Sequence, residues 1–87
     1  MYYTYVLQSS KDSNFYVGFT QDLKQRFEEH ENGRVDSTKN RRPLKLVYYE
    51  ACLDSSDATN REEYLKTHYG RMYLKKRLKS CFTGFTQ

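Results

Sequence analysis

A histidine and an arginine occupy what should be the apolar face of a helix near the N-terminus. Residues 20–33 predict this helix, in which positions 23, 26, 27 and 30 fall on one side. Leu23 and Phe27 are the core residues expected there, whereas Arg26 and His30 are exceptions. A half-buried charge destabilises a fold unless it is paired or has a function. Arg26 therefore either extends past the sheet edge or serves a site, where its guanidinium would bind phosphate in bidentate fashion.

The second predicted helix, residues 54–68, contains a similar exception. Ala58, Leu65 and Tyr69 mark its inward face, and Arg61 and Glu62 fall between them. A structural interpretation is an ion pair between Glu62 and Arg26. The chemical interpretation is that this single carboxylate holds one hydrated Mg²⁺ or Mn²⁺, with a substrate phosphate completing the coordination shell. Together with a phosphate-binding arginine, such a metal site is typical of phosphodiester hydrolysis.

Two tyrosines are predicted to face the same side of a β-hairpin. If Tyr5 lies opposite Tyr16, the connection spans residues 8–13, and the two phenols project on one face. A cation or metal ion lowers the pKa of a nearby phenol, which can then act as a base, and His30 is placed to take its proton. Gly18 either lets another group approach the strand closely or eases a bend.

Three strands and three helices must position these residues. The strands are predicted over residues 2–8, 15–19 and 44–52, and the helices over residues 20–33, 54–68 and 71–79. Thr20 is the expected cap of the first helix, and Gly70 is expected to end the second. The order ββαβαα predicts an α+β fold, a three-stranded antiparallel sheet flanked by helices. We expect one nuclease-like domain over residues 1–80 and a frayed tail over residues 81–87.

Composition narrows the class of protein. The net charge of +4 and the pI near 9.1 favour a polyanionic partner. Nine tyrosines without a tryptophan are a strong bias, although most are expected to be half-buried sheet residues. No apolar run is long enough to cross a membrane, and the N-terminus lacks a signal-peptide pattern. Cys52 and Cys81 are expected to be reduced thiols, which indicates a cytoplasmic protein.

The order of these motifs resembles the GIY-YIG endonuclease superfamily over residues 2–79. Residues 3–7 and 15–20 are similar to its two signature strands, residues 22–30 to its first helix, and residues 58–66 to its metal-binding helix. Gly33, Thr38 and residues 42–44 and 46–50 resemble the connecting segment of its small stand-alone branch. That branch is similar to the N-terminal nuclease domain of the excinuclease C subunit.

The resemblance implies a role for each candidate residue. Tyr5 and Tyr16 would be the signature tyrosines, with Tyr5 as the water-activating base. Arg26 would bind phosphate, His30 would be the family's histidine, and Glu62 would be the ligand of one Mg²⁺ or Mn²⁺ ion. The function implied is a metal-dependent DNA endonuclease, structure-directed or weakly specific, in DNA repair or recombination. RNA stays open as a substrate.

The chain departs from the family pattern at four places. The first motif reads Thr4-Tyr5-Val6, without its glycine, and the second reads Tyr16-Val17-Gly18; both changes suit a strand and keep the tyrosines. Phe19 stands where some members carry a basic residue. The asparagine that many members carry after the metal-binding helix has no counterpart in residues 67–79, so its role is lost or passed to another residue.

Exposed basic residues are predicted to contact the nucleic acid. They are Lys39, Arg41, Arg42, Arg71, Lys75 and Lys76. The main alternative to an enzyme is a binding module that keeps the fold but does not cut, with tyrosines of the last helix stacking on bases. A protein-interaction domain is a third class, supported only by the number of aromatic residues. We expect no membrane association and a monomer or weak dimer.

Overall fold

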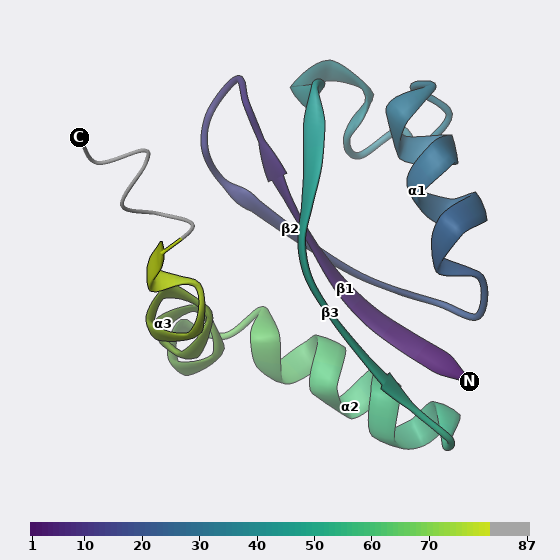
Figure 1. The fold of residues 1–87 in the computed structure, drawn as a ribbon, viewed down its shortest axis with the longest axis vertical. Coiled ribbons are helices and arrows are strands. Elements are labelled where there is room, and N and C mark those ends of the chain that lie inside the picture. Colours follow the sequence, from purple (N-terminus) through teal and green to yellow (C-terminus); the bar gives the residue numbers. More distant parts are fainter. Residues whose placement is uncertain (81–87) are drawn as a thin grey trace.

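The computed structural model describes residues 1–80, whose core is a three-stranded antiparallel sheet in the order β2-β1-β3. The strands are β1 (Tyr2–Ser9), β2 (Phe15–Thr20) and β3 (Leu44–Cys52). The central strand β1 alternates between two buried faces, since Thr4 to Ser9 are all buried. Both β2 and β3 are edge strands (Figure 1).

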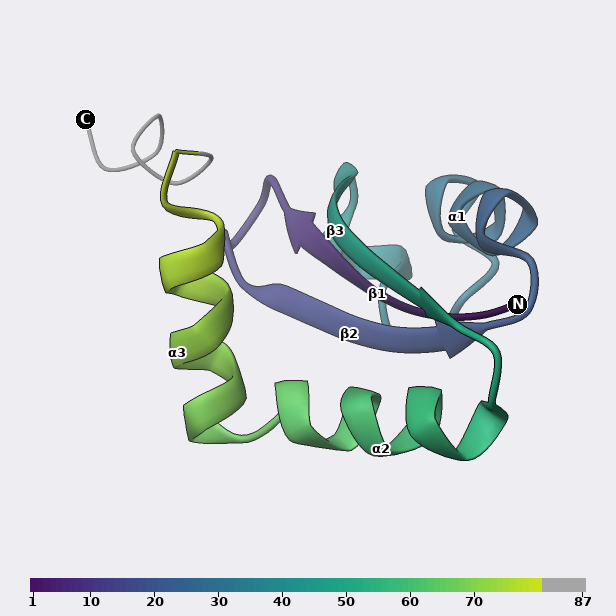
Figure 2. The ribbon, with the colours of Figure 1, turned by 60° about the horizontal axis from the view of Figure 1, so that its bottom comes forward.

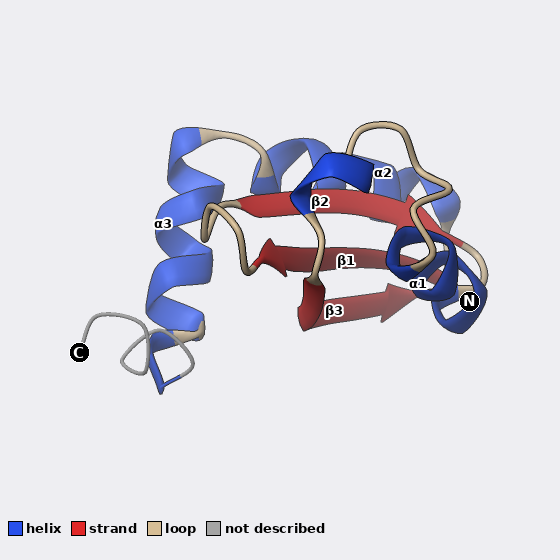
Figure 3. Cartoon of the chain, turned by 90° about the horizontal axis from the view of Figure 1, so that it is seen from above, coloured by secondary structure: helices blue, strands red, loops and turns tan. Residues whose placement is uncertain are grey.

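Helices cover both faces of the sheet. They are α1 (Leu23–Glu31), a short 3₁₀ turn η1 (Lys39–Arg41), α2 (Ser55–Leu65) and α3 (His68–Arg77). The helix α1 packs on one face of the sheet, and α2 runs along the other face. The helix α3 follows at the C-terminal end of α2 (Figure 2). Seen from above, the three strands lie between α1 and α2 (Figure 3). The predicted order ββαβαα and the α+β class are therefore confirmed.

Two apolar clusters hold these layers together. On the α1 face, Tyr5, Leu7 and Leu44 pack with Leu23 and Phe27 of the helix. On the other face, a second cluster joins the sheet to α2 and α3. It consists of Val6, Val17, Leu65 and Leu74, with Val47, Tyr48 and Tyr73 packed against it. The alternation along β1 thus sends odd-numbered side chains to α1 and even-numbered side chains to α2.

The predicted hairpin register was wrong by two residues. Tyr5 lies opposite Gly18, and Leu7 lies opposite Tyr16, so the connection spans residues 10–14. A β-carbon at Gly18 would overlap the Tyr5 ring, which shows that this glycine makes room for the phenol across β2. Because a shift of two residues preserves the face of each side chain, Tyr5 and Tyr16 still share one face, with ring centroids 6.4 Å apart.

Several helix boundaries also differ from the prediction. The second helix was predicted to run to residue 68 and the third to span residues 71–79, whereas α2 ends at Leu65 and α3 spans His68–Arg77, so Tyr69 lies on α3 and is 73% exposed instead of facing inward. Asp22 rather than Thr20 caps α1, since its side chain accepts the backbone N–H of Gln25. Gly70 does not end the second helix but lies inside α3, which is capped by the Thr67 side chain. A β-carbon at Gly70 would overlap the carbonyl of Tyr64, so this glycine permits the close approach of α3 to the end of α2.

The glycine predicted to end the first helix does so. Gly33 follows α1 in the left-handed conformation (φ 75°). Cys52 is a half-buried free thiol, while Cys81 and the predicted tail over residues 81–87 lie outside the described residues. No helix within residues 1–80 is long and apolar enough to cross a bilayer.

Candidate active site

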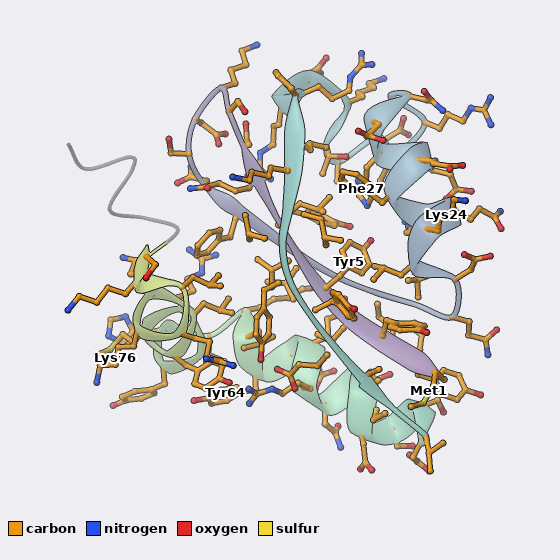
Figure 4. All side chains as sticks on the ribbon, viewed as in Figure 1. Met1, Tyr5, Lys24, Phe27, Tyr64 and Lys76 are labelled. Carbon is orange, nitrogen blue, oxygen red and sulfur yellow. The ribbon has the colours of Figure 1, made fainter. Side chains whose placement is uncertain are left out.

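A buried chain of hydrogen bonds links β1, α1 and η1. The Tyr5 hydroxyl lies 2.9 Å from Nε2 of His30, and Nδ1 of His30 lies 2.7 Å from Oγ1 of Thr38. Tyr5 is 1% exposed, and His30 and Thr38 are fully buried. Figure 4 shows the Tyr5 side chain leaving the sheet on the side of α1. The prediction that His30 lies within reach of a phenol therefore agrees with the geometry.

Local sequence explains why this chain forms. Gly18 leaves the space over β2 that the Tyr5 ring fills. His30 is at the end of α1, one turn beyond Arg26, and Thr38 follows the turn that brings the chain back toward β3. The Thr38 hydroxyl also lies 3.5 Å from the carbonyl of Val35. If that hydroxyl donates to Val35, it accepts from Nδ1–H, and His30 accepts the Tyr5 hydroxyl proton at Nε2.

Burial keeps His30 neutral and Tyr5 protonated. Loss of hydration, and secondarily the charge of Arg26, lowers the pKa of His30 to about 4. Burial also raises the pKa of the Tyr5 phenol, an effect that its interaction with the Arg26 guanidinium opposes. The His30 imidazole is therefore uncharged at neutral pH and available as a hydrogen-bond acceptor. A cation added near Tyr5 would favour transfer of the phenol proton.

Arg26 and Tyr16 complete the site on the α1 face. The Tyr16 ring packs edge-on against His30, with centroids 5.1 Å apart. Arg26 donates from Nη1 to the Glu29 carboxylate at 3.0 Å, and its pKa is raised first by its interaction with the Tyr5 hydroxyl and then by Glu29. About a third of the Arg26 side chain is exposed, at the wall of an open hollow between the end of β2 and α1. A phosphate group can therefore reach this guanidinium.

Glu62 comes from α2, the helix on the opposite face of the sheet. Its side chain is 20% exposed, and Oε2 accepts from the Lys66 ammonium at 3.1 Å. Glu62 lies on the flank of α2 away from Arg61, which reaches toward β3, so Glu62 is directed toward β2. Its carboxylate contributes to the raised pKa of Tyr5, whose ring crosses β2 at Gly18. The five candidate residues thus gather around the β2 edge, four on one face and Glu62 on the other.

The ion pair considered between Arg26 and Glu62 does not form. Arg26 pairs with Glu29, and Glu62 pairs with Lys66, each within its own helix. Both pairs are partly exposed, and pairs of this kind contribute only about 0–1 kcal/mol to stability. A ligand or substrate can therefore replace either partner at little cost.

The donor set fits a metal ion held mainly by water and substrate. Within residues 1–80, no group of three or more histidine, cysteine, aspartate or glutamate side chains could hold a metal. Glu62 offers one partly exposed carboxylate, whose Oε1 makes no hydrogen bond in the described part of the chain. A single carboxylate combined with phosphate oxygens is a usual environment for Mg²⁺.

The predicted nucleic-acid contacts fall into two separate groups. In the first, Arg41 bonds Asp12 at 3.2 Å, Lys39 lies 3.6 Å from Asp36, and Arg42 donates to the backbone carbonyls of Lys39 and Glu31. These side chains are largely engaged in holding the segment between α1 and β3.

The second group lies on α3 and consists of Arg71, Lys75 and Lys76. All three side chains are exposed and form no ion pair within residues 1–80. The η1 segment and α3 lie apart in Figures 1, 2 and 3, so the two groups do not make one continuous surface.

Arg61 has a role that the sequence pattern did not reveal. Its Nε donates to both carboxylate oxygens of Glu50 on β3, at 3.1 and 2.8 Å. Its guanidinium lies over the rings of Tyr64 and Tyr73, 5.2 and 4.7 Å from their centroids. The Tyr48 hydroxyl donates to the same Glu50 carboxylate at 2.8 Å. This network ties α2 and α3 to the outer strand β3.

The fold and the placement of these residues define a GIY-YIG domain, and the family model described as the GIY-YIG catalytic domain matches residues 1–77. The chain belongs to this family of nuclease domains, which implies a nucleic-acid substrate. Within the family it is similar to the small UPF0213 proteins, whose name states no activity.

Three of these relatives illustrate the similarity. A UPF0213 protein of Clostridium perfringens is 40% identical over 67 residues, covering 76% of this chain and 71% of the relative. One from Staphylococcus saprophyticus is 37% identical over 75 residues, covering 85% and 90%. The solution NMR structure of a UPF0213 protein from Bacillus halodurans is 28% identical, with a TM-score of 0.54 and coverage of 85% of this chain and 82% of that one.

Proposed function

We propose that this protein is a divalent-metal-dependent endonuclease that hydrolyses DNA phosphodiester bonds. The observation that carries the proposal is the buried hydrogen bond between Tyr5 and His30 beside Arg26. A tyrosine that only filled the core would need one acceptor, and a backbone carbonyl would serve. Here a neutral imidazole accepts the proton, and a guanidinium stands next to the oxygen that would become negative. The imidazole gives the phenol proton an acceptor, and the guanidinium opposes the rise in the Tyr5 pKa, so positive charge added beside the phenol would allow it to act in proton transfer.

Each side chain has a definite task in the proposed reaction. Arg26 binds the scissile phosphate and offsets the charge that develops on it. His30 accepts the phenol proton of Tyr5, and the phenolate is then the base that receives a proton from the attacking water. Tyr16 packs the imidazole in place. Since only 1% of Tyr5 is exposed, the Tyr16 ring or the Arg26 side chain must shift when the substrate binds.

Glu62 is the proposed ligand of one Mg²⁺ or Mn²⁺ ion. When bound, such an ion supplies positive charge for the phosphate oxygens and the leaving group. Nucleases of this family generally depend on a divalent ion. The Lys66 ammonium lies 3.1 Å from the same carboxylate and would have to move aside for the ion. The identity of the ion and a role in DNA repair or recombination are part of the same proposal.

A non-catalytic nucleic-acid-binding module is the second candidate function. The basic residues of α3, which form no ion pair within residues 1–80, favour it, since α3 stands apart from α1 (Figure 2). Against it, a glutamate near the phosphate site would repel a polyanion unless a metal ion is bound. Binding without any cutting in Mg²⁺ or Mn²⁺ would support this second function.

Nicking of supercoiled plasmid DNA by the wild type and by Tyr5→Phe tests the proposed role of the phenol. Tyr49→Phe is a matched control, because Tyr49 is 54% exposed on β3 and has no place in the site. We expect nicking only with a divalent ion, a rate loss of about 100-fold or more in Tyr5→Phe, and none in Tyr49→Phe. Equal rates for Tyr5→Phe and the wild type would overturn the assignment of the base.

A further inference from the structure

The net positive charge of the protein comes entirely from its C-terminal part. Residues 64–87 hold six of the 15 lysines and arginines and none of the 11 acidic residues. The other nine basic residues are outnumbered by those 11, so residues 1–63 carry a net charge of −2. All six of these basic residues lie within residues 66–79, on α3 and next to it. This end of the molecule is therefore the natural place for a polyanion to bind.

Helix α3 presents its charges on the side away from the sheet. Gly70 and Leu74 are buried, whereas Arg71, Lys75 and Lys76 are exposed. Tyr69 lies two turns before Lys76 on the same side of the helix and is 73% exposed. An aromatic ring and several cations thus share one solvent-facing half of α3.

Tyr64, at the end of α2, adds a second ring that is held in place. It is 41% exposed, and its other side faces the Arg61 guanidinium, which Glu50 and Tyr73 fix. Figure 4 shows Tyr64 and Lys76 at the same end of the molecule, formed by α2 and α3. A ring that is already fixed loses little entropy when a flat ligand stacks on its open face. Tyr73 cannot serve in this way, because it packs against Arg61 and Tyr48.

We propose that this end of the protein binds single-stranded nucleic acid, with unpaired bases stacking on Tyr64 and Tyr69. Arg71, Lys75 and Lys76 contact the phosphates. We call these five residues the stacking surface. Exposed rings among cations are typical of proteins that bind single strands, whereas a duplex hides the faces of its bases. The proposal rests on the proposed function and specifies its substrate as DNA with a single-stranded segment.

An anionic membrane is a less suitable partner for the same charges. A helix that lies in a membrane interface needs an apolar face to insert. The apolar side of α3 is already packed on the sheet, since Leu74 is fully buried and Tyr73 and Leu78 pack against the same cluster. Met72 is the only exposed aliphatic side chain of α3.

The stacking surface is separate from the candidate active site. Tyr64 lies on the flank of α2 that faces β3, while Glu62 lies on the flank that faces β2. Binding to the stacking surface should therefore not require the metal ion. This separation allows binding and cutting to be measured independently.

Fluorescence anisotropy with a labelled 15-nucleotide oligo(dT) in EDTA tests the proposal. Stacking of one base contributes about 1–3 kcal/mol, so Tyr64→Leu and Tyr69→Leu should each weaken binding about 5-fold or more. Tyr49→Leu, which removes another exposed ring, should bind like the wild type. Wild-type affinity in both Tyr64→Leu and Tyr69→Leu, or equal affinity for a duplex of the same length, would overturn the proposal.

Charge reversal provides a second and independent test of the stacking surface. The double variant Lys75→Glu, Lys76→Glu should reduce the slope of log K against log salt by about 1.4 or more, because each phosphate contact on a single strand contributes about 0.7. Reversal of the exposed Lys24 and Lys45 is the matched control and should have little effect. Equal losses in the two double variants would contradict a localised surface. Phosphatidylserine vesicles that displace the oligonucleotide would show instead that the partner is a membrane.

The oligonucleotide and nicking results separate the two proposals. If the protein never cuts but binds oligo(dT) through Tyr64 and Tyr69, the stacking surface is supported and the endonuclease is refuted. If it cuts but the Tyr64 and Tyr69 variants bind like the wild type, the endonuclease stands and the stacking surface is refuted.

Discussion

Lowering the pH should destabilise this protein through His30. The imidazole is fully buried, and its pKa is lowered to about 4, chiefly by loss of hydration. In the unfolded chain the pKa is about 6.5. Between these two values, the unfolded state binds a proton that the folded state does not. The stabilisation is therefore fully present above pH about 6.5 and is lost as the pH falls toward 4.

The size of this effect follows from the difference between the two pKa values. Each pKa unit corresponds to about 1.4 kcal/mol. A folded pKa of about 4 against an unfolded pKa of about 6.5 gives a loss near pH 5 of about 2 kcal/mol, and about 3 kcal/mol below pH 4. For a domain of this size, 2 kcal/mol is a large share of the total stability.

Urea denaturation followed by circular dichroism at pH 7.5, 6 and 5 measures the effect. His30→Gln is the control, because glutamine can hydrogen-bond but does not titrate. The wild type should lose about 2 kcal/mol more than His30→Gln between pH 7.5 and pH 5. The same pH dependence in the wild type and His30→Gln would refute a buried neutral imidazole.

Four further results are expected from the structure. Gly18→Ala should lower stability by about 1–3 kcal/mol, because the new methyl group overlaps the Tyr5 ring; a smaller loss in the Tyr5→Leu background, by urea melts, would confirm the cause, and equal losses would contradict it. Thr38→Val leaves Nδ1 of His30 buried without a partner and should cost about 1–3 kcal/mol in the same assay, whereas an unchanged midpoint would count against that bond. Gly70→Ala should destabilise by about 1–3 kcal/mol or more through the contact with the end of α2, and wild-type stability there would show that the helices are not so close. EDTA should abolish plasmid nicking but leave the thermal midpoint unchanged, and a large drop in that midpoint would indicate a structural metal instead.

The sequence was sufficient to predict the architecture and the strand boundaries, whereas the helix boundaries were missed by up to three residues. Alternating aromatic residues identified the strands, and the helical exceptions Arg26 and His30 turned out to lie beside Tyr5. The hairpin register could not be obtained in the same way, because a shift of two residues preserves every face. The observed pairing places the Tyr5 ring over Gly18, which has no side chain to obstruct it.

Other features depended on contacts between different elements of the fold. Gly70 was predicted to end a helix, but a glycine stands there because α3 approaches the end of α2 closely. The inward position of Arg61 on α2 is explained by Glu50, which pairs with it from β3 at 2.8 Å. Thr38 stood in a polar segment without periodicity, so nothing local indicated that it would bond the His30 ring.

In the proposed mechanism Glu62 serves the cutting of DNA, and a comparison with its neighbour Glu63 tests this role most directly. Both are glutamates on α2, but Glu63 is exposed and points about 100° away. Plasmid nicking in Mn²⁺ should fall by about 100-fold or more in Glu62→Ala and stay near the wild-type rate in Glu63→Ala. Nicking by Glu62→Ala at the wild-type rate would contradict the proposed active site.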